Sequence, residues 1–130
     1  RAEAMGLEIL ARIVSQGQYS DEPHLLHTVP AQAGLRALAK AGVRPGDLHL
    51  VEINEAFAAV TIISARLLGV SPEIVNVNGG AIAIGHPIGA SGARILMHLV
   101  YELRRRGGGL GLAAICSGGG QGEATLIRVD

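Results

Sequence analysis

The chain has 130 residues, 48% of them hydrophobic, and its 11 basic and 11 acidic side chains give a formal net charge of zero. A neutral chain lacks the basic surface of a nucleic-acid-binding domain and gives no support for an anionic membrane partner, and no apolar run reaches the roughly 18 residues of a membrane span. The single cysteine, Cys116, leaves no internal disulfide, which is typical of a reducing compartment and predicts a cytoplasmic protein of one domain.

Strands and helices alternate along the first half of the chain. A β-branched run predicts a strand at 7–18, with polar, loop-like residues from 16 to 22. Leucines and alanines at helical spacing predict a helix at 30–41, with a glycine placed to end it. A short strand is predicted at 48–53. The helix predicted at 54–68 begins with an asparagine that suits the N-cap.

The second half continues the alternation. We expect a strand at 74–77, a helix at 87–106, and strands at 111–116 and 124–129 that flank a glycine-rich turn. Alternating strands and helices indicate an α/β sheet with crossover helices, and the closing pair of strands predicts an antiparallel hairpin. The predicted order is strand-helix-strand-helix-strand-helix-strand-strand, in a mixed sheet.

The most informative stretch is the glycine-rich segment 76–94. His86 stands in it directly before Pro87, so its backbone is kept out of the helical region, and the proline suits the first helical position. The ring should therefore be aimed by a bend at a helix N-terminus. Gly89 and Gly92 follow, and because a helical glycine costs about 1 kcal/mol relative to alanine, we expect another backbone or a ligand to pack against them.

Asn54, His86 and Cys116 are each predicted to lie just past the end of a strand. The carboxyl ends of strands are where open α/β sheets bind ligands, so parallel strands would bring the three side chains into one crevice. Taken singly, the asparagine is a helix cap, the cysteine a small buried hydrophobe and the histidine structural. The glycines that follow Cys116 favour chemistry, because their N–H groups are free to face an oxyanion.

Phosphate binding is a rival interpretation of the glycine-rich segment. Residues 80–85 match the first half of a P-loop, but His86 and Pro87 stand where that loop needs lysine and serine or threonine. The chain also has no G-x-S-x-G elbow, and none of its histidines has metal-ligand spacing with an acid or thiol. The sequence therefore gives no support for a phosphate loop or a metal site.

Three motifs together resemble the thiolase family: NEAF at 54–57, NGGAIAIGHPIGASG at 78–92 and CSGGGQG at 116–122. The resemblance is to the C-terminal half, of the acetyl-CoA acetyltransferase kind, and covers essentially all of 1–130. It implies a mixed five-stranded sheet with crossover helices, one of two similar halves in a layered sandwich. The chain starts with arginine in what reads as mid-helix, so we expect a piece of a longer protein.

The resemblance also implies roles for single residues. His86 would activate a nucleophilic cysteine and help bind a thioester oxyanion, and Asn54 would hold a water that completes this oxyanion hole. Cys116 would be the acid or base that moves the α-proton of acetyl-CoA. The N–H of Gly118 would contribute to a second oxyanion hole, and Phe57 would line the channel for the pantetheine arm.

The activity implied is reversible Claisen condensation of acetyl-CoA, or thiolysis of acetoacetyl-CoA or a longer 3-ketoacyl-CoA. No metal or redox cofactor is implied, because the CoA thioester is the substrate. The nucleophilic cysteine of the family lies in the N-terminal half, so we expect this chain to be inert by itself, and the complete enzyme to be a homo-oligomer. Residues 24–31, HLLHTVPA, depart from the glycine-rich turn of many thiolases, which leaves the chain-length preference open.

Related readings remain open beside this one. Condensing enzymes of the ketoacyl-synthase type share the fold, but a cysteine in the last motif favours thiolase. Thiolase-like lipid-carrier proteins and the trifunctional enzyme tend to have histidine at the position of Asn54. From a different class, the chain could be a non-catalytic thiolase-like subunit or a structural, CoA-binding partner. The presence of all three polar residues favours catalysis.

Overall fold

Extended segments from both ends of the chain pair with each other in the computed structural model, which describes residues 1–130. Strand β1 (Arg12–Ser20) lies antiparallel to β4 (Gln121–Val129), and β4 forms an antiparallel hairpin with β3 (Gly109–Ser117). Strand β2 (Leu50–Ile53) closes the other edge parallel to β3, which gives the order β1-β4-β3-β2. The predicted mixed α/β sheet and the closing hairpin are confirmed.

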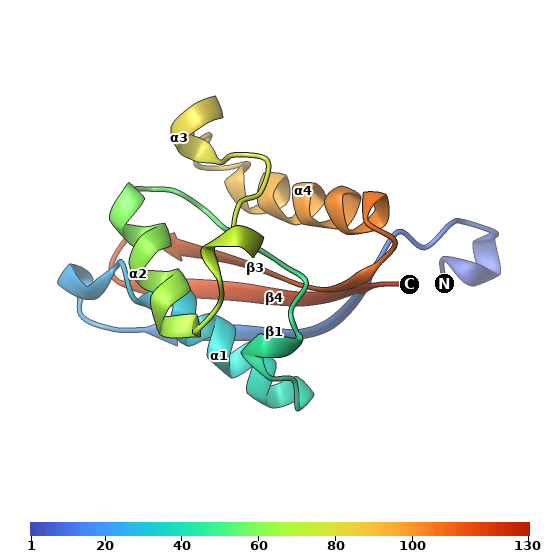
Figure 1. Ribbon diagram of the computed structural model, residues 1–130, viewed down its shortest axis with the longest axis horizontal. Coiled ribbons are helices and arrows are strands. Elements are labelled where there is room, and N and C mark those ends of the chain that lie inside the picture. The colour runs from blue at the N-terminus through green and yellow to red at the C-terminus, as the bar shows by residue number, and fades with distance from the viewer.

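Helices cover both faces of this sheet (Figure 1). Helices α1 (Val29–Ala41) and α2 (Ala58–Leu68) lie on one face, and α4 (Ser91–Arg105) lies on the other. A single short helix, α3 (Ala81–Ile84), precedes α4. Single-turn 3-10 helices lie in the connections at Glu3–Met5, Pro23–Leu25, Pro45–Asp47 and Pro72–Ile74.

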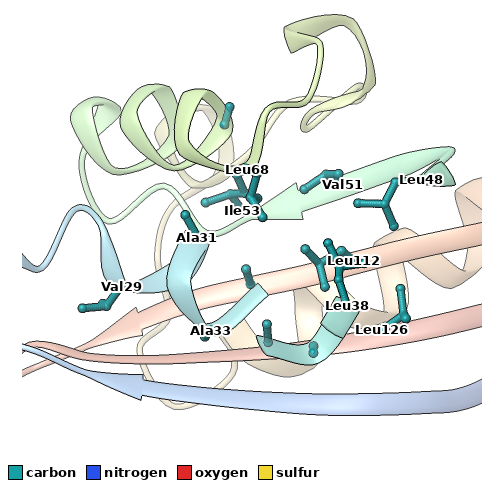
Figure 2. Close-up of a cluster of buried hydrophobic side chains, with 14 of the residues drawn as sticks. Val29, Ala31, Ala33, Leu38, Leu48, Val51, Ile53, Leu68, Leu112 and Leu126 are labelled. Atoms are coloured by element: carbon teal, nitrogen blue, oxygen red, sulfur yellow. The ribbon is translucent and has the colours of Figure 1, made fainter. Parts of the chain in front are cut away.

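The larger hydrophobic core lies between the sheet and the pair α1 and α2. Figure 2 shows Leu38 of α1 beside Leu112 and Leu126 of the two central strands, and Leu68 of α2 above Ile53 of β2. All five side chains are at most 2% exposed. Because alternate residues of a strand face opposite sides of a sheet, this core takes every second residue of β3.

A smaller core lies under α4. Ile95, Leu99 and Leu103 recur at helical spacing and pack against Leu50 of β2 and the neighbouring strands. Gly111 of β3 makes room for two of these leucines, because a β-carbon there would lie 2.8 Å from each of their terminal methyl groups. The apolar side of α4 therefore packs over a position of the sheet that carries no side chain.

Two predicted helix ends are confirmed by backbone geometry. Gly42 follows α1 at φ 66°, and Gly69 follows α2 at φ 71°. Both are left-handed conformations that side chains other than glycine rarely adopt. In each case the glycine N–H donates to carbonyls of the last helical turn, which would otherwise lack a partner at the end of the helix.

The prediction of a strand at 74–77, the third of five in chain order, is wrong, and the sheet has four strands. Only Val75 pairs, in an isolated parallel bridge with Val51. The next residue, Asn76, has φ 47° and turns the chain away from the sheet. Its side chain then replaces a strand partner, because Oδ1 accepts the Ile53 N–H at 2.8 Å and Nδ2 donates to the Ile53 carbonyl at 2.9 Å. At the edge of β2, one side-chain amide rather than a neighbouring strand therefore pairs with the backbone N–H and carbonyl of Ile53.

The predicted starts of two helices are also wrong. Asn54 is not an N-cap: α2 begins only at Ala58, after Phe57, and the asparagine side chain is used elsewhere. Pro87 is not the first residue of α4, because it opens a separate turn in which its carbonyl accepts the N–H of Ser91 at 2.8 Å. In both places the chain inserts a short irregular segment between strand and helix.

The first strand is displaced relative to the prediction. It begins at Arg12 and runs through Ser20, so residues 16–20 are strand where a polar loop was expected. Pairing with β4 supplies their backbone partners, and side chains of α1 cover the edge, with Lys40 Nζ donating to the Gln16 carbonyl at 2.8 Å. Long-range pairing here outweighs the polar local composition.

A buried carboxylate ties α4 to the glycine-rich loop. The Glu102 side chain is 4% exposed and accepts hydrogen bonds from Arg105, from Arg106 Nε at 2.6 Å and from Asn78 Nδ2 at 2.8 Å. Desolvation by itself would raise the pKa of Glu102, but hydrogen bonds from Arg106, Asn78 and Arg105 outweigh it and hold the pKa at about 2. Because the pKa is lower in the folded state, the ionised carboxylate stabilises the folded protein at pH values above its ordinary pKa. This stabilisation is lost as the pH falls toward 2.

We therefore expect Glu102→Gln to lower the free energy of unfolding at neutral pH by about 1–3 kcal/mol. The difference from the unmodified protein should shrink as the pH falls through the acid range. Urea unfolding measured across that range checks both statements. The exposed Glu73→Gln is the matched control and should leave the profile unchanged, whereas a constant difference between Glu102→Gln and the unmodified protein would contradict the assignment.

Candidate active site

The structure brings the three predicted polar residues to one edge of the sheet. Asn54 directly follows β2, and Cys116 is the penultimate residue of β3 rather than lying past its end. Because the two strands are parallel, their carboxyl ends lie side by side, and the Asn54 N–H donates to the Ala114 carbonyl at 3.0 Å. His86 arrives from the loop between α3 and α4. A cleft at this edge is lined by His86 and Cys116 but not by the buried Asn54, and a loop brings His86 there in place of a third strand.

His86 is held from both ring nitrogens. Nδ1 lies 2.6 Å from Ser91 Oγ, and Nε2 lies 3.3 Å from Asn54 Nδ2. The serine hydroxyl donates its only proton to the Pro87 carbonyl at 3.0 Å. With that bond made, the serine oxygen accepts from Nδ1–H, and Nε2 keeps a lone pair that accepts from the asparagine amide. In this tautomer Nε2 is unprotonated and faces the amide of Asn54.

Cys116 shares a cleft of about 410 Å³ with His86 and Gly118. Leu26 and Ile88 contribute apolar lining to the same cleft. The cysteine is 8% exposed, and burial raises the pKa of its thiol, so the sulfur stays protonated near neutral pH. At Gly118 a β-carbon would meet no atom within 4 Å, so space adjoins its backbone. The cleft can hold an apolar group between a base and a thiol.

Behind this cleft, the amide of Asn54 has a second partner. The residue is fully buried, and Arg94 Nη2, on the second turn of α4, donates to its Oδ1 at 3.2 Å. Buried side-chain amides need partners for both ends, and here each end has one. The arrangement joins α4, the end of β2 and the His86 loop in one hydrogen-bonded chain.

Comparison with known proteins decides the family. Residues 7–129 match the family described as "Thiolase, C-terminal domain". The chain belongs to the thiolase family. The resemblance drawn from the three motifs is thereby confirmed.

Thiolases of several organisms are similar to this chain along nearly its whole length. It is 51% identical over 128 residues to the probable acetyl-CoA acetyltransferase of Mycobacterium leprae, covering 98% of this chain and 33% of the relative. It is 52% identical over 127 residues to the cytosolic acetyl-CoA acetyltransferase of Mus musculus, covering 98% of this chain and 32% of that relative. The chain thus spans about a third of the length of these curated thiolases.

Solved thiolase structures show the same fold. Human mitochondrial 3-ketoacyl-CoA thiolase superposes with a TM-score of 0.95 at 45% identity, over 99% of this chain and 33% of that one. The acetyl-CoA acetyltransferase of Bacillus anthracis superposes equally well, at a TM-score of 0.95 and 43% identity. The architecture described above is therefore that of a thiolase C-terminal domain.

Besides the buried Asn54, one predicted site residue of this thiolase domain does not line the cleft, namely Phe57. It precedes α2, is 64% exposed, and does not line the cavity that holds His86 and Cys116. Its contact with a pantetheine arm stays a prediction. A β-carbon at Gly89 or Gly92 would meet no atom of this chain within 4 Å, and Gly92 lines the cleft, so the backbone or ligand expected to pack against them stays a prediction.

Sequence reasoning missed two residues that hold the site together, Ser91 and Arg94. Both lie in the glycine-rich segment 76–94, of which the sequence pattern singles out only the glycines, the histidine and the proline. Their spacing on the first turns of α4 puts them on one helix face, beside the histidine loop and the end of β2. Polar residues on the buried side of an amphipathic helix were the available signal, since Ser91 is fully buried.

No group of three or more His, Cys, Asp or Glu side chains could hold a metal ion. No helix combines the length and apolar character needed to cross a bilayer.

Proposed function

We propose that this chain is the C-terminal part of an acetyl-CoA C-acetyltransferase and supplies half of its active site. The complete enzyme would catalyse reversible Claisen condensation of two acetyl-CoA, or thiolysis of acetoacetyl-CoA or a longer 3-ketoacyl-CoA. The observation that carries the proposal is His86, held with Nε2 unprotonated and facing the Asn54 amide, in the same cleft as a protonated Cys116. The names of the relatives support the same chemistry.

In this proposal His86 moves the proton of the nucleophile. Nε2 takes the proton from a cysteine thiol supplied by the N-terminal half, and the thiolate attacks the acyl carbonyl. The departing CoA thiolate takes a proton in turn. The imidazolium at Nε2 can also donate to a thioester oxyanion, with Asn54 holding a water as the second donor. Preorganised donors of this kind typically contribute about 3–4 kcal/mol each to transition-state stabilisation.

Cys116 would handle the α-proton. In condensation its thiolate removes this proton from the second acetyl-CoA, and in thiolysis its thiol returns a proton to the enolate. The raised pKa of the thiol suits the proton-donating direction at neutral pH, because the sulfur is protonated before the step. The N–H of Gly118 would stabilise the oxyanion of the acyl-enzyme. The proposal requires no metal or redox cofactor, so a chelator should leave thiolysis unchanged.

The remaining part of the site would come from an N-terminal half. Cys116 is the only cysteine, so the nucleophile has to come from outside these residues. Ile82, Ile84 and Ile88 flank His86 and are 67%, 69% and 84% exposed, an apolar surface that a covering segment would bury. We propose that the N-terminal half covers it, in a homo-oligomeric enzyme. The cytosolic mouse relative supports a cytoplasmic location.

Activity assays of the chain by itself test the proposal. We expect the purified 130-residue chain to show no thiolysis of acetoacetyl-CoA, because it lacks the nucleophile, and the complete protein to show thiolysis that depends on CoA. The assay follows the loss of acetoacetyl-CoA with and without chelator. Thiolysis by the chain itself would contradict the half-site. An inactive complete protein would favour the non-catalytic, CoA-binding alternative.

A further inference from the structure

We propose that Arg94 is a positioning residue for His86: it fixes which way the amide of Asn54 faces and so keeps the proton of His86 on Nδ1. The inference rests on the proposed function for its kinetic consequence. The geometry itself stands on hydrogen bonds described above, from Arg94 Nη2 to Asn54 Oδ1 at 3.2 Å and between Asn54 Nδ2 and His86 Nε2 at 3.3 Å.

The direction of each hydrogen bond is set by which groups can donate and which can accept. A guanidinium only donates hydrogen bonds, whereas an amide has one accepting and one donating end of nearly equal shape. Facing Arg94, Asn54 has to present its oxygen, so its NH₂ group has to face the histidine. That NH₂ group can only donate, so His86 Nε2 has to accept. Without the cation, nothing at the Arg94 side would prevent the amide from rotating by half a turn.

A rotated amide would change the histidine. With Oδ1 of Asn54 facing Nε2, the favoured form carries the proton on Nε2, and the lone pair needed for a base is lost there. Nδ1 would then have to accept from Ser91, whose hydroxyl proton is now donated to the Pro87 carbonyl. The whole chain of donors from α4 to the loop would reverse. Arg94 therefore selects one of two internally consistent hydrogen-bond patterns.

The environment of Arg94 supports a fixed rather than a mobile side chain. Its Nε and Nη1 are buried and without hydrogen-bond partners, so the bond to Asn54 is the only one that orients the guanidinium group. On the same side of α4, the carboxylate of Glu52, whose side chain is 4% exposed, lies 3.2 Å from His98 Nδ1 and contributes negative charge near Arg94. A half-buried cation whose one hydrogen bond goes to a buried amide indicates a directing role rather than a surface one.

The inference is tested in the complete protein with Arg94→Met, which removes the donor, and Arg94→Lys, which keeps a cation that can only donate. The matched control is Arg66→Met, because Arg66 is exposed on α2 and makes no side-chain hydrogen bond. We expect Arg94→Met to lower kcat for thiolysis about 10- to 100-fold with KM within about threefold, because the histidine is misdirected while the cleft remains. Arg94→Lys should recover most of this loss, and Arg66→Met should match the unmodified protein.

Nitrogen-15 NMR of the His86 ring gives a readout that does not depend on turnover. The unmodified protein should show the proton on Nδ1, and Arg94→Met should show it shifted toward Nε2. An unchanged tautomer in Arg94→Met, or equal kinetic loss in Arg94→Met and Arg94→Lys, would overturn the inference. A tautomer change in a protein without thiolase activity would instead leave the inference standing and refute the proposed function.

Discussion

Replacing His86 by alanine in the complete protein is expected to abolish thiolysis of acetoacetyl-CoA, with kcat/KM lowered at least about 10⁴-fold. The substitution removes a general base, which typically contributes 10²–10⁴-fold, together with an oxyanion donor typically worth about 10²–10³-fold. The fold should survive, because the histidine lies in a loop in which residues 82–90 are all exposed. Steady-state kinetics and thermal unfolding of the variant measure the two effects separately.

A histidine elsewhere in the domain provides the control for this experiment. His49 stands just before β2, at the end of the strand opposite Asn54, and accepts the Leu110 N–H at 3.2 Å. His49→Ala removes the same side chain and one hydrogen bond, so it should cost some stability and little activity. His86→Ala with thiolysis within tenfold of the unmodified protein would refute the catalytic role, and the non-catalytic alternative would then be preferred.

The sequence predicted well where local chemistry decides the conformation. Gly42 and Gly69 marked helix ends because the left-handed conformation there favours glycine strongly. The closing hairpin was visible because glycines separate two apolar runs. The placement of Asn54 and Cys116 at one edge of the sheet was foreseen because parallel strands carry their carboxyl ends to a common edge. Each of these inferences depends on one or a few neighbouring residues.

The prediction was wrong where a side chain forms hydrogen bonds with residues that are far away in the sequence. The segment at 74–77 has strand composition, but the Asn76 amide satisfies the β2 edge in place of a strand. Asn54 is a residue type that favours the N-cap, yet its side-chain amide forms hydrogen bonds with His86 and Arg94 instead. Neither partner can be identified from spacing, because the residues that meet are distant in the chain. The thiolase motifs were therefore recognisable before the contacts that orient their side chains.

The packing of α1 on the sheet is a further feature that the sequence did not reveal. Gly17 lies in the middle of β1 and reads as an ordinary strand residue, yet α1 passes directly over it. A β-carbon at this position would lie 2.0 Å from the Ala33 carbonyl oxygen and 2.7 Å from the Ala37 nitrogen. Gly122 of β4 has the same role at the start of the helix, where a β-carbon would lie 2.3 Å from the Val29 carbonyl oxygen.

We expect Gly17→Ala to lower the free energy of unfolding by about 3 kcal/mol or more, at the upper end of the usual cost of overpacking. The obstacle is helix backbone, which cannot rotate away as a side chain can, so α1 has to lift from the sheet and loosen the larger core. Urea unfolding measures the loss. Gly46→Ala is the matched control, because a β-carbon there meets nothing within 4 Å, and it should be neutral or slightly stabilising.

The combination of Gly17→Ala with Gly122→Ala distinguishes a shift of the whole helix from two local clashes. If each alanine raises α1, the first substitution creates part of the space that the second requires, so the double variant should lose less stability than the sum of the single losses. Contacting sites typically show such coupling at about 0.5–3 kcal/mol. Strict additivity would mean that the helix bends separately at Val29 and Ala33. Helix α1 also packs against α2, which follows Asn54, so a displacement of α1 should be passed on through α2 to the cleft. Both single variants should therefore lose some thiolase activity in the complete protein.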